Sequence, residues 1–434
     1  MNKPKLLLIH PAPDIDRLGS RRRRVSSVPK LNLPLLAAYA DDFFEVSIID
    51  ETVEDLDFDI RANLVAITVL TQVAHRAYEI ANEFAKRGAK VVLGGFHVYF
   101  FPDEAAEHAD ALVIGEAEGV WQQLLQDFLA GNLKRRYQRD TPHNLVGLRK
   151  PRLDLVKKEA YATPHVMETS RGCPHKCEYC AVTLFWGHRY RTRPIQEVVD
   201  EIRSMPSGDI AFVDDNIIGI PSRAKELFKA MIPLKRKWYG QADLKLARDP
   251  ELLDLCTRSG CQWLFMGIES TNRQNLEDVG KSRVNEVKQY QESIKTIQYA
   301  GINVFGSFIF GLDHDDQTVF DDTVQFCVDN RLQAANFYLF IPLPFTRLFD
   351  RMERAGRILH RDWSRYDGNH VVFHPMLMTP NELMDGYLHA YRSLYSIRSI
   401  FKRTFRPRWD MFQALALNVG RKLNYRYFEE GCRL

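Results

Sequence analysis

The stretch Ser170-Arg-Gly-Cys-Pro-His-Lys-Cys-Glu-Tyr-Cys180 places three cysteines within eight positions, after a predicted strand and before a predicted helix. Soft thiolate ligands at this density select zinc or an iron–sulfur cluster. Zinc is normally four-coordinate, and although His175 can complete a Cys3His site, the CxxxCxxC spacing is not the usual finger or ribbon pairing. The spacing favours a four-iron cluster held by Cys173, Cys177 and Cys180, with one iron left free for a substrate-like ligand.

Strands and helices alternate on the C-terminal side of this loop. We predict strands at 166–169, 210–213, 238–241, 263–267, 303–310 and 335–341. Apolar residues at helical spacing fall between them, at 196–204, 223–231, 250–259, 286–300 and 318–330. Six strand–helix units imply a partial (β/α)6 barrel with an open lateral face, whose ligands gather at the C-terminal ends of the strands.

A second alternating series precedes the loop. Short apolar runs predict strands at 5–10, 45–49, 64–69, 90–93 and 111–114, with helices at 73–87 and 118–129. This pattern indicates a Rossmann-like, doubly wound parallel sheet. The predicted fold class is therefore α/β, with a Rossmann-like domain at 1–140, a linker at 141–161, a barrel at 162–349 and a helical, basic C-terminal region at 350–434.

Composition limits the class of protein. The chain has 434 residues, 45% of them hydrophobic, and a formal net charge of +3, which suits a multidomain globular protein without a nucleic-acid partner. No apolar run reaches the roughly 18 residues of a membrane span, and we expect no secretory signal. The cysteines outside the loop are scattered, at Cys256, Cys261, Cys327 and Cys432. We therefore expect a cytoplasmic protein with a metal site and no disulfide framework, and with membrane contact only at its surface.

The cysteine loop resembles that of the radical S-adenosylmethionine (SAM) superfamily, whose CxxxCxxC motif follows the first strand of a partial barrel. The resemblance implies that the free iron chelates the amino and carboxylate groups of SAM. It also implies that one-electron reduction, from a low-potential donor such as flavodoxin or ferredoxin, cleaves the sulfonium to a 5′-deoxyadenosyl radical. Tyr179, in the aromatic position before the last cysteine, matches a site near the adenine.

The later strand ends carry further matches to the SAM contacts of this superfamily. Near the methionine amine the resemblance places Asp214, Asp215 and Asn216, although Gly-Gly-Glu is commoner there. Near the ribose and the adenine it places Glu269, Ser270, Gly306 and Gly311. The carboxylate of Glu269 can accept hydrogen bonds from two ribose hydroxyls. The missing side chains of Gly306 and Gly311 would let the backbone approach the adenine closely. The alternative is that the Asp-Asp-Asn run caps a helix and the second glycine makes a turn.

Three arginines follow the cysteine loop, at Arg189, Arg191 and Arg193. They can hold the SAM carboxylate or a substrate acid, or they can form a solvated helix entry. Phe345, in Ile341-Pro-Leu-Pro-Phe-Thr346, stands where relatives commonly carry Gly. Because this loop follows the sixth strand, we predict that the ring narrows substrate access to the active site, with core packing as the alternative.

The N-terminal domain resembles the cobalamin-binding domain joined to many radical SAM enzymes. The resemblance rests on Leu33-Pro-Leu-Leu-Ala-Ala-Tyr39, Thr68-Val-Leu-Thr71, Gly94-Gly-Phe-His97 and Gly115-Glu-Ala-Glu118. It assigns cobalamin contacts to Thr68, Leu70, Thr71, Gly94, Gly95, His97, Gly115 and Glu116. The motif Asp-x-His-x-x-Gly, which supplies a cobalt ligand elsewhere, is absent, so we expect cobalt to lack a protein imidazole. The alternative is a Rossmann-like domain that has lost the cofactor and serves only as a docking surface, which we call the dock alternative.

Taken together, the two domains resemble cobalamin-dependent radical SAM enzymes related to anaerobic magnesium-protoporphyrin cyclase, bacteriochlorophyll side-chain methyltransferases and hopanoid-modifying enzymes. The resemblance implies hydrogen abstraction from an unactivated carbon of a hydrophobic or tetrapyrrole-like small molecule, and favours C-methylation. Radical cyclisation or carbon–carbon coupling is an alternative. A cofactor-binding electron carrier or cobalamin sensor is a candidate of another class, disfavoured by the strand-end motifs. A cobalamin-free methylthiotransferase is disfavoured by the missing auxiliary cysteines.

The C-terminal region is strongly basic. Residues 391–434 hold ten Lys or Arg against three acids, which gives 10 − 3 = +7, and Phe401, Phe405, Trp409 and Phe412 are interleaved with them. This mixture suits an interfacial helix, whose cations bind anionic lipid head groups and whose rings are buried in the membrane surface. Helical core packing with a solvated basic face explains the same residues.

Overall fold

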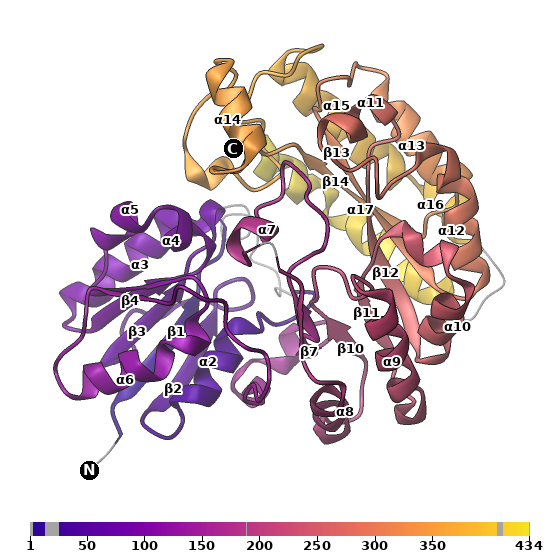
Figure 1. The fold of residues 1–434 in the computed structure, drawn as a ribbon. Helices are drawn as coiled ribbons and strands as arrows, with labels where there is room; N and C mark the ends of the chain where they lie inside the picture. Colours follow the sequence, from indigo (N-terminus) through magenta and orange to yellow (C-terminus); the bar gives the residue numbers. More distant parts are fainter. Residues whose placement is uncertain (1–2, 14–25, 188, 406–410, 434) are drawn as a thin grey trace. The chain divides into compact units, whose positions relative to one another are not determined.

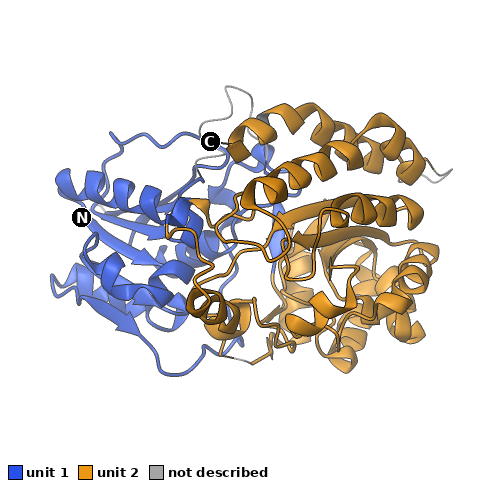
Figure 2. Cartoon of the chain, turned by 90° about the horizontal axis from the view of Figure 1, so that it is seen from above, with its two compact units in different colours: residues 1–167, 362–364 blue, residues 168–361, 365–434 orange. Residues whose placement is uncertain are grey.

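The computed structural model describes residues 3–13, 26–187, 189–405 and 411–433, and it divides the chain into two compact units (Figures 1 and 2). Unit 1 comprises residues 1–167 and 362–364, and unit 2 comprises residues 168–361 and 365–434. Each unit is built on its own parallel sheet, which confirms the predicted α/β class. The finer division into four segments, with boundaries at 140, 161 and 349, stays a prediction.

Unit 1 contains a six-stranded sheet in the order β2-β1-β3-β4-β5-β6, with every pair parallel. Its strands are β1 (Lys5–His10), β2 (Glu45–Asp50), β3 (Leu64–Thr68), β4 (Lys90–Gly94), β5 (Ala111–Ile114) and β6 (Arg136–Gln138). Its α-helices are α2 (Asn32–Ala40), α3 (Ala74–Lys86), α4 (Phe96–Phe100), α5 (Pro102–Ala106) and α6 (Trp121–Leu129). Short 3-10 turns are η1 (Thr71–Val73), η2 (Ala117–Gly119), η3 (Leu153–Leu155) and η4 (Lys158–Ala160). The five predicted strands are confirmed, and β6 is an addition.

The order of these strands determines where a ligand can bind. Strand β1 lies between β2 and β3, so the chain first adds a strand on one side and then builds outward on the other. A parallel sheet of this kind places its crevice beyond the carboxyl ends of the strands at that reversal. The loops after β3, β4 and β5 leave neighbouring strands at this same edge. Residues 6–9 of β1 are fully buried, as expected for a strand covered on both faces.

The segment predicted as a linker is packed onto unit 1. The Arg152 N–H donates to the Pro34 carbonyl at 2.9 Å, and the guanidinium of Arg149 lies 5.4 Å from the ring centroid of Tyr39. Both contacts are with helix α2. Because a mixed run of Pro, Asn, Gly and charged residues has no period, sequence pattern alone cannot show that such a segment has packing partners.

The second sheet forms the predicted partial barrel, and all of its strands except β7 belong to unit 2. This sheet has the order β14-β13-β12-β11-β10-β7, in which neighbouring strands follow one another along the chain, apart from a separate antiparallel pair of β8 (Ser170–Arg171) and β9 (Arg191–Thr192). The barrel strands are β7 (His165–Met167), β10 (Ile210–Phe212), β11 (Trp238–Gln241), β12 (Cys261–Glu269), β13 (Asn303–Phe310) and β14 (Ala334–Leu339). All six strands were predicted, with β12 beginning and ending two residues beyond the predicted range.

Helices follow the barrel strands, as predicted. They are α7 (Val182–Phe185), α8 (Ile195–Ser204), α9 (Pro221–Met231), α10 (Pro250–Arg258), α11 (Arg273–Asp278), α12 (Tyr290–Tyr299), α13 (Val319–Asp329) and α14 (Arg347–Arg354). The 3-10 turns are η5 (Ile232–Leu234), η6 (Leu244–Arg248), η7 (Val287–Gln289) and η8 (Trp363–Arg365). Side-chain caps explain several starts: Asp249 accepts from the Leu252 N–H ahead of α10, and Asn272 accepts from the Gln274 N–H ahead of α11.

Three helices complete the chain, as predicted for the C-terminal region: α15 (Pro380–Leu394), α16 (Ile397–Thr404) and α17 (Met411–Arg433). Ala414 of α17 packs in a buried cluster with Trp263 of β12. Arg403 of α16 is fully buried and donates to the carbonyls of Leu332 and Leu394 at 2.9 and 2.8 Å. Arg403 of the basic region is therefore structural, as in the alternative of helical core packing.

Arg406, Arg408, Trp409 and the side chain of Tyr427 lie outside the described residues. Within the described part of the chain, no helix is long and apolar enough to cross a membrane.

Candidate cluster and cofactor sites

The cysteine loop is held from three sides in unit 2. The Gly172 N–H donates to Asp215 Oδ2 at 3.0 Å, just before the first cysteine. His175 Nε2 lies 2.7 Å from Asp243 Oδ2, and the Glu178 N–H donates to the Val279 carbonyl at 3.0 Å. These contacts fix the loop, and its three cysteines form no disulfide and have intermediate exposure.

The donor set of the loop, three cysteine thiols, fits an iron–sulfur cluster. Among the described residues, no three His, Cys, Asp or Glu side chains converge on a point where one ion can bind. In a four-iron cluster each thiolate binds a different iron, so such convergence is not needed. Nε2 of His175, the candidate fourth zinc ligand, lies against the carboxylate of Asp243. Burial raises the pKa of Cys173 to about 11 and that of Cys180 to about 12.

A buried ion pair lies against this loop. Lys281 Nζ donates to Glu269 Oε1 at 2.6 Å, and the hydroxyl of Tyr179 donates to the same oxygen at 3.2 Å. Burial alone would lower the pKa of Lys281, but the charges of Glu269 and Cys177 outweigh it and raise that pKa. The pair thus places one fixed positive charge and one carboxylate beside the cysteines. The second oxygen of Glu269 has no hydrogen-bond partner in the described part of the chain.

Local backbone geometry makes room for the pair. The register of β12 against β13 shifts between Gly267 and Glu269, as in a β-bulge, and Glu269 has a φ of 66°. A Cβ atom on Gly267 would lie 2.3 Å from Glu269 Oε1 and 2.8 Å from Lys281 Nζ. Left-handed φ at a non-glycine residue is costly and occurs where the surroundings impose it, often at functional sites. The bulge therefore re-aims Glu269 at the end of its strand.

The three polar residues after β10 have partners within the protein. Asp214 is fully buried and accepts from the Thr169 N–H and from the Thr169 hydroxyl, the latter at 2.7 Å. Asn216 Nδ2 donates to Asp243 Oδ2 at 2.9 Å. Burial raises the pKa of Asp214 and of Asp215 to about 6. The three residues brace the cysteine loop, and their direct contact with SAM stays a prediction.

Ser270 and Gly311 are connected by a buried network that sequence inspection missed. Asn275 Nδ2 donates to Asp315 Oδ1 at 2.6 Å and lies 3.4 Å from Ser270 Oγ. Asp315 Oδ2 accepts from the N–H groups of Gly311 and Leu312, both at 3.0 Å. Burial raises the pKa of Asp315 to about 7. The network fixes the ends of β12 and β13 relative to each other, at the edge where ligands of a barrel bind.

Gly306 has a packing role that differs from the predicted one. A Cβ on Gly306 would lie 2.9 Å from the Phe308 ring and 3.0 Å from Leu332, so the space beside it is filled by apolar side chains. The missing side chain thus serves the core, and contact with adenine stays a prediction. Of the three arginines, Arg193 is buried and donates to Glu201 Oε2 at 2.6 Å, which removes it as a carboxylate binder. Arg191 lies against the Trp186 ring, and Arg189 is exposed.

In unit 1, the loops after β3 and β4 are in direct contact. The Val69 N–H donates to the Gly94 carbonyl at 2.7 Å, and Asn32 Nδ2 donates to Thr68 Oγ1 at 2.9 Å. Gly95 has a φ of 109°, and a Cβ there would lie 2.8 Å from the Val69 carbonyl oxygen. Only glycine permits this approach. Leu70 and Gly94 are partly exposed and Thr71 is buried.

The loop after β5 is open where the other two are tight. Gly115 has a φ of 88°, and a Cβ built on it would meet no atom within 4 Å. Beside it, Glu116 Oε2 accepts from the His143 N–H at 2.5 Å. Three loops at a single sheet edge, two of them with glycine and one of these open, fit a large, flat cofactor, so the residues present are compatible with cobalamin.

His97 is placed differently from the prediction. Its ring is fully buried, Nε2 lies 3.1 Å from Glu104 Oε1, and the rings of Phe101 and Trp363 pack against it. Trp363 Nε1 donates to Glu104 Oε2 at 3.3 Å. A side chain without exposed surface cannot touch a cofactor, so the predicted contact of His97 with cobalamin is corrected. Its side chain joins α4 to Glu104 of α5, and no local sequence signal points to Trp363 as a further partner of Glu104, more than 250 residues away.

Phe345 is exposed and has a left-handed backbone, with a φ of 66°. The left-handed backbone explains why glycine is expected at this position. Because the ring is exposed, Phe345 does not pack in the core. Left-handed geometry costs a side chain about 1–2 kcal/mol, and glycine loses about 0.5–1 kcal/mol through unfolded-state entropy. We expect Phe345→Gly to raise the free energy of unfolding by up to about 1 kcal/mol in a denaturant titration.

If Phe345 also narrows substrate access, the same Phe345→Gly variant is expected to accept larger substrates and to increase uncoupled SAM cleavage. Lys235→Gly is the matched control, since Lys235 is exposed and has a φ of 51°. Both variants gain stability, but only the first changes substrate range. An unchanged range in Phe345→Gly removes the residue from the access route.

Comparison with protein families agrees with this geometry. Residues 167–327 match the radical SAM superfamily, residues 21–125 match the B12 binding domain, and residues 346–420 match a domain of unknown function, DUF4070. The first match covers the cysteine loop and the barrel strands up to β13, and the second covers the loops after β3, β4 and β5.

Characterised relatives extend the match along most of the chain. The bacteriochlorophyllide d C-12(1)-methyltransferase of Chlorobaculum tepidum is 30% identical over 386 residues, which span 86% of this chain and 84% of the relative. The hopanoid C-2 methylase of Rhodopseudomonas palustris is 27% identical over 77% of this chain and 66% of the relative. Among solved structures, the fold is similar to that of the methyltransferase TsrM from Kitasatospora setae with cobalamin and a [4Fe-4S] cluster bound. That comparison has a TM-score of 0.70, 16% identity, and coverage of 100% of this chain and 99% of the other.

Matches to both cofactor domains, and a 30% identical relative aligned over most of its length, place the chain in a family. The chain belongs to the radical SAM enzymes that carry a B12-binding domain, and its cofactors are a [4Fe-4S] cluster, SAM and cobalamin.

Proposed function

We propose that the protein is a C-methyltransferase that acts on an unactivated carbon of a hydrophobic, tetrapyrrole-like small molecule. The observation that carries the proposal is the alignment with the bacteriochlorophyllide d C-12(1)-methyltransferase, which covers both cofactor domains. Hydrophobic substrates of two kinds appear among the relatives, a bacteriochlorophyllide and a hopanoid. We infer a small-molecule substrate of this hydrophobic class, with a low-potential electron donor such as flavodoxin or ferredoxin as the reductant.

Within unit 2, we propose that Cys173, Cys177 and Cys180 hold the cluster. When bound, the cluster supplies the electron that cleaves SAM, and cobalamin supplies the methyl group. The bulge at the end of β12 aims Glu269 at the edge of the barrel, where its free oxygen is suited to accept from the ribose hydroxyls of SAM. Lys281 donates to Oε1 of Glu269 at 2.6 Å and so fixes the position of this carboxylate.

Within unit 1, we propose that cobalamin lies over the loops at Thr68, Gly94 and Gly115 without a histidine bound to cobalt. His97 is engaged by Glu104 and fully buried, which supports this arrangement. We expect protein reconstituted with hydroxocobalamin to give a Co(II) electron paramagnetic resonance spectrum without nitrogen superhyperfine splitting. Splitting from an imidazole would contradict the proposal, and a protein that retains no cobalamin would support the dock alternative instead.

The substrate class is tested by anaerobic incubation with bacteriochlorophyllide d, a reductant and SAM that carries a deuterated methyl group. We expect mass spectrometry to find a product that has gained the labelled methyl. A product without label but with an added ring would favour cyclisation, the activity that names a 26% identical relative from Cereibacter sphaeroides. If bacteriochlorophyllide d stays unchanged while a hopanoid gains the label in a parallel reaction, the substrate belongs to the hopanoid class instead.

A further inference from the structure

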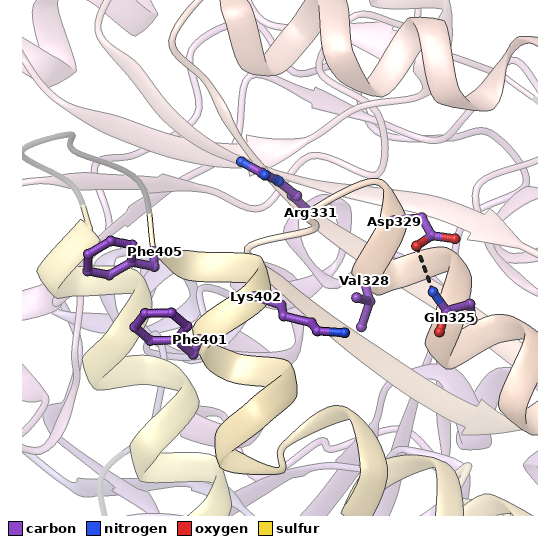
Figure 3. Close-up of a pocket in the computed structure, with 7 residues that line it drawn as sticks. All are labelled: Gln325, Val328, Asp329, Arg331, Phe401, Lys402 and Phe405. Carbon is purple, nitrogen blue, oxygen red and sulfur yellow. Dashed lines mark hydrogen bonds between the residues drawn. The ribbon is translucent and has the colours of Figure 1, made fainter.

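An exposed pocket lies between α13 and α16, with a volume of about 480 Å³. Figure 3 shows Phe401 and Phe405 on one side, Gln325, Val328 and Asp329 on the other, and Lys402 between them. Arg331 completes the lining. We call Phe401, Lys402, Phe405 and Arg331 the basic–aromatic patch. It lies at the C-terminal end of α13, next to the start of β14, and hence at the end of the barrel opposite to the strand ends that carry Glu269.

The two rings of the patch are exposed because the opposite face of α16 is fixed in the core. Phe401 and Phe405 are each 59% exposed and stack on one another with centroids 4.6 Å apart. One turn earlier, Ile397 is 72% exposed, so Ile397 and Phe401 line one face of α16 and Phe405 follows at its C-cap. Arg403 locks the opposite face of α16 inward through its bonds to Leu332, Leu394 and Asn418, and the helix therefore cannot turn its rings into the core.

Helix α17 has a second exposed apolar stripe. Phe412, Leu415, Val419 and Leu423 recur at spacings of three or four residues and are 72%, 40%, 39% and 67% exposed. Residues at this spacing share one helix face. Helices α16 and α17 pack against each other, so two apolar faces belong to one helical pair. Exposed apolar surface on this scale marks an interaction site.

The charges around the patch are positive. Arg331, Arg398, Lys402 and Lys422 are exposed, and none has an acidic partner among the described residues. The one acid of the pocket, Asp329, accepts from Gln325 Nε2 at 2.6 Å. A second copy of the chain docked symmetrically on this face would bring like charges together, which costs energy. A surface that is both apolar and anionic complements the patch.

We propose that the α16–α17 pair docks the enzyme onto an anionic lipid bilayer, with the rings of the basic–aromatic patch in the head-group region and its cations on lipid phosphates. This surface lies away from the cysteine loop, so docking leaves the C-terminal ends of the barrel strands open. The inference goes beyond the proposed reaction and does not depend on it, because lipid binding is measurable without turnover.

The test is co-sedimentation of the full chain with vesicles of phosphatidylcholine alone or mixed with phosphatidylglycerol. We expect binding only to the mixed vesicles, weakened as salt is raised. Phe401→Ser with Phe405→Ser is expected to lower the partition coefficient at least about tenfold. Lys402→Gln with Arg331→Gln is expected to lower it by about fivefold per charge. Because all four side chains are exposed, circular dichroism should show both variants folded.

Tyr299→Ser is the matched control, since Tyr299 is an aromatic residue that is 87% exposed on α12, outside the patch. It is expected to bind like the unmodified protein. Equal sedimentation with both kinds of vesicle, no sedimentation at all, or unaltered binding of the patch variants would overturn the proposal. So would a concentration-dependent dimer that the double Phe variant abolishes, since that result would assign the surface to a second copy.

Discussion

Replacement of Cys173, Cys177 and Cys180 by alanine is expected to remove iron, sulfide and SAM cleavage together. The three thiols are on one braced loop, and we propose that they bind three different irons of a single cluster. The unmodified protein, purified anaerobically, should contain about four irons and four sulfides per chain. The triple variant should have neither, lose its brown colour, and form no 5′-deoxyadenosine with SAM and dithionite.

The matched control for the triple variant is Cys432→Ala. Cys432 is a buried thiol of helix α17, outside the cysteine loop, so its loss should lower stability slightly and leave iron content unchanged. A triple alanine variant that still makes 5′-deoxyadenosine would show that the cluster is elsewhere. No alternative set is evident in the described residues, because Cys256, Cys261 and Cys327 are all buried under the helices of the barrel.

Lys281→Met is expected to destabilise the protein by about 3–5 kcal/mol, because it leaves the Glu269 carboxylate buried without its cation. Both side chains are close to fully buried, and their contact is 2.6 Å. The measurement is the midpoint of urea unfolding followed by far-ultraviolet circular dichroism. Tyr179→Phe removes only a neutral donor to the same carboxylate and should cost about 1 kcal/mol.

The double variant Lys281→Met with Glu269→Gln separates stability from function. With both charges removed, most of the lost stability should return. SAM binding, measured by equilibrium dialysis, should stay weak because the carboxylate proposed for the ribose is gone. If the double variant binds SAM as tightly as the unmodified protein, Glu269 does not contact SAM and serves only as the structural partner of Lys281.

Much of the fold follows from sequence because its elements are long and strongly patterned. The buried strands β1 and β3 read as continuous apolar runs, which is how strands covered on both faces appear. The cysteine loop and Glu269 can both be singled out from the sequence, since the loop follows the short strands β7 and β8 and Glu269 ends β12. Strand β6, with one buried residue among three, has too little pattern to predict.

The remaining features depend on tertiary contacts that no local pattern encodes. Lys281 is twelve residues from its partner Glu269, and Trp363 joins Glu104 from the far end of the chain. Asp214 could not be assigned from the sequence for a different reason. The sequence pattern of a carboxylate at a strand end is the same whether its partner is a ligand or a loop N–H. His97 was assigned to cobalamin for its position after a glycine pair, and its burial is visible only in the folded structure.

The central claim is that one protein uses a cluster-driven cleavage of SAM and a cobalamin-dependent methyl transfer in the same turnover. Such a reaction consumes one SAM for the radical and a second SAM for the methyl group. The direct measurement is the ratio of 5′-deoxyadenosine to S-adenosylhomocysteine, followed over time in cobalamin-loaded protein with bacteriochlorophyllide d and a reductant. The account predicts that both products form in equal amounts, and that S-adenosylhomocysteine is lost without cobalamin. Formation of 5′-deoxyadenosine with no S-adenosylhomocysteine, while the substrate is consumed, would contradict it.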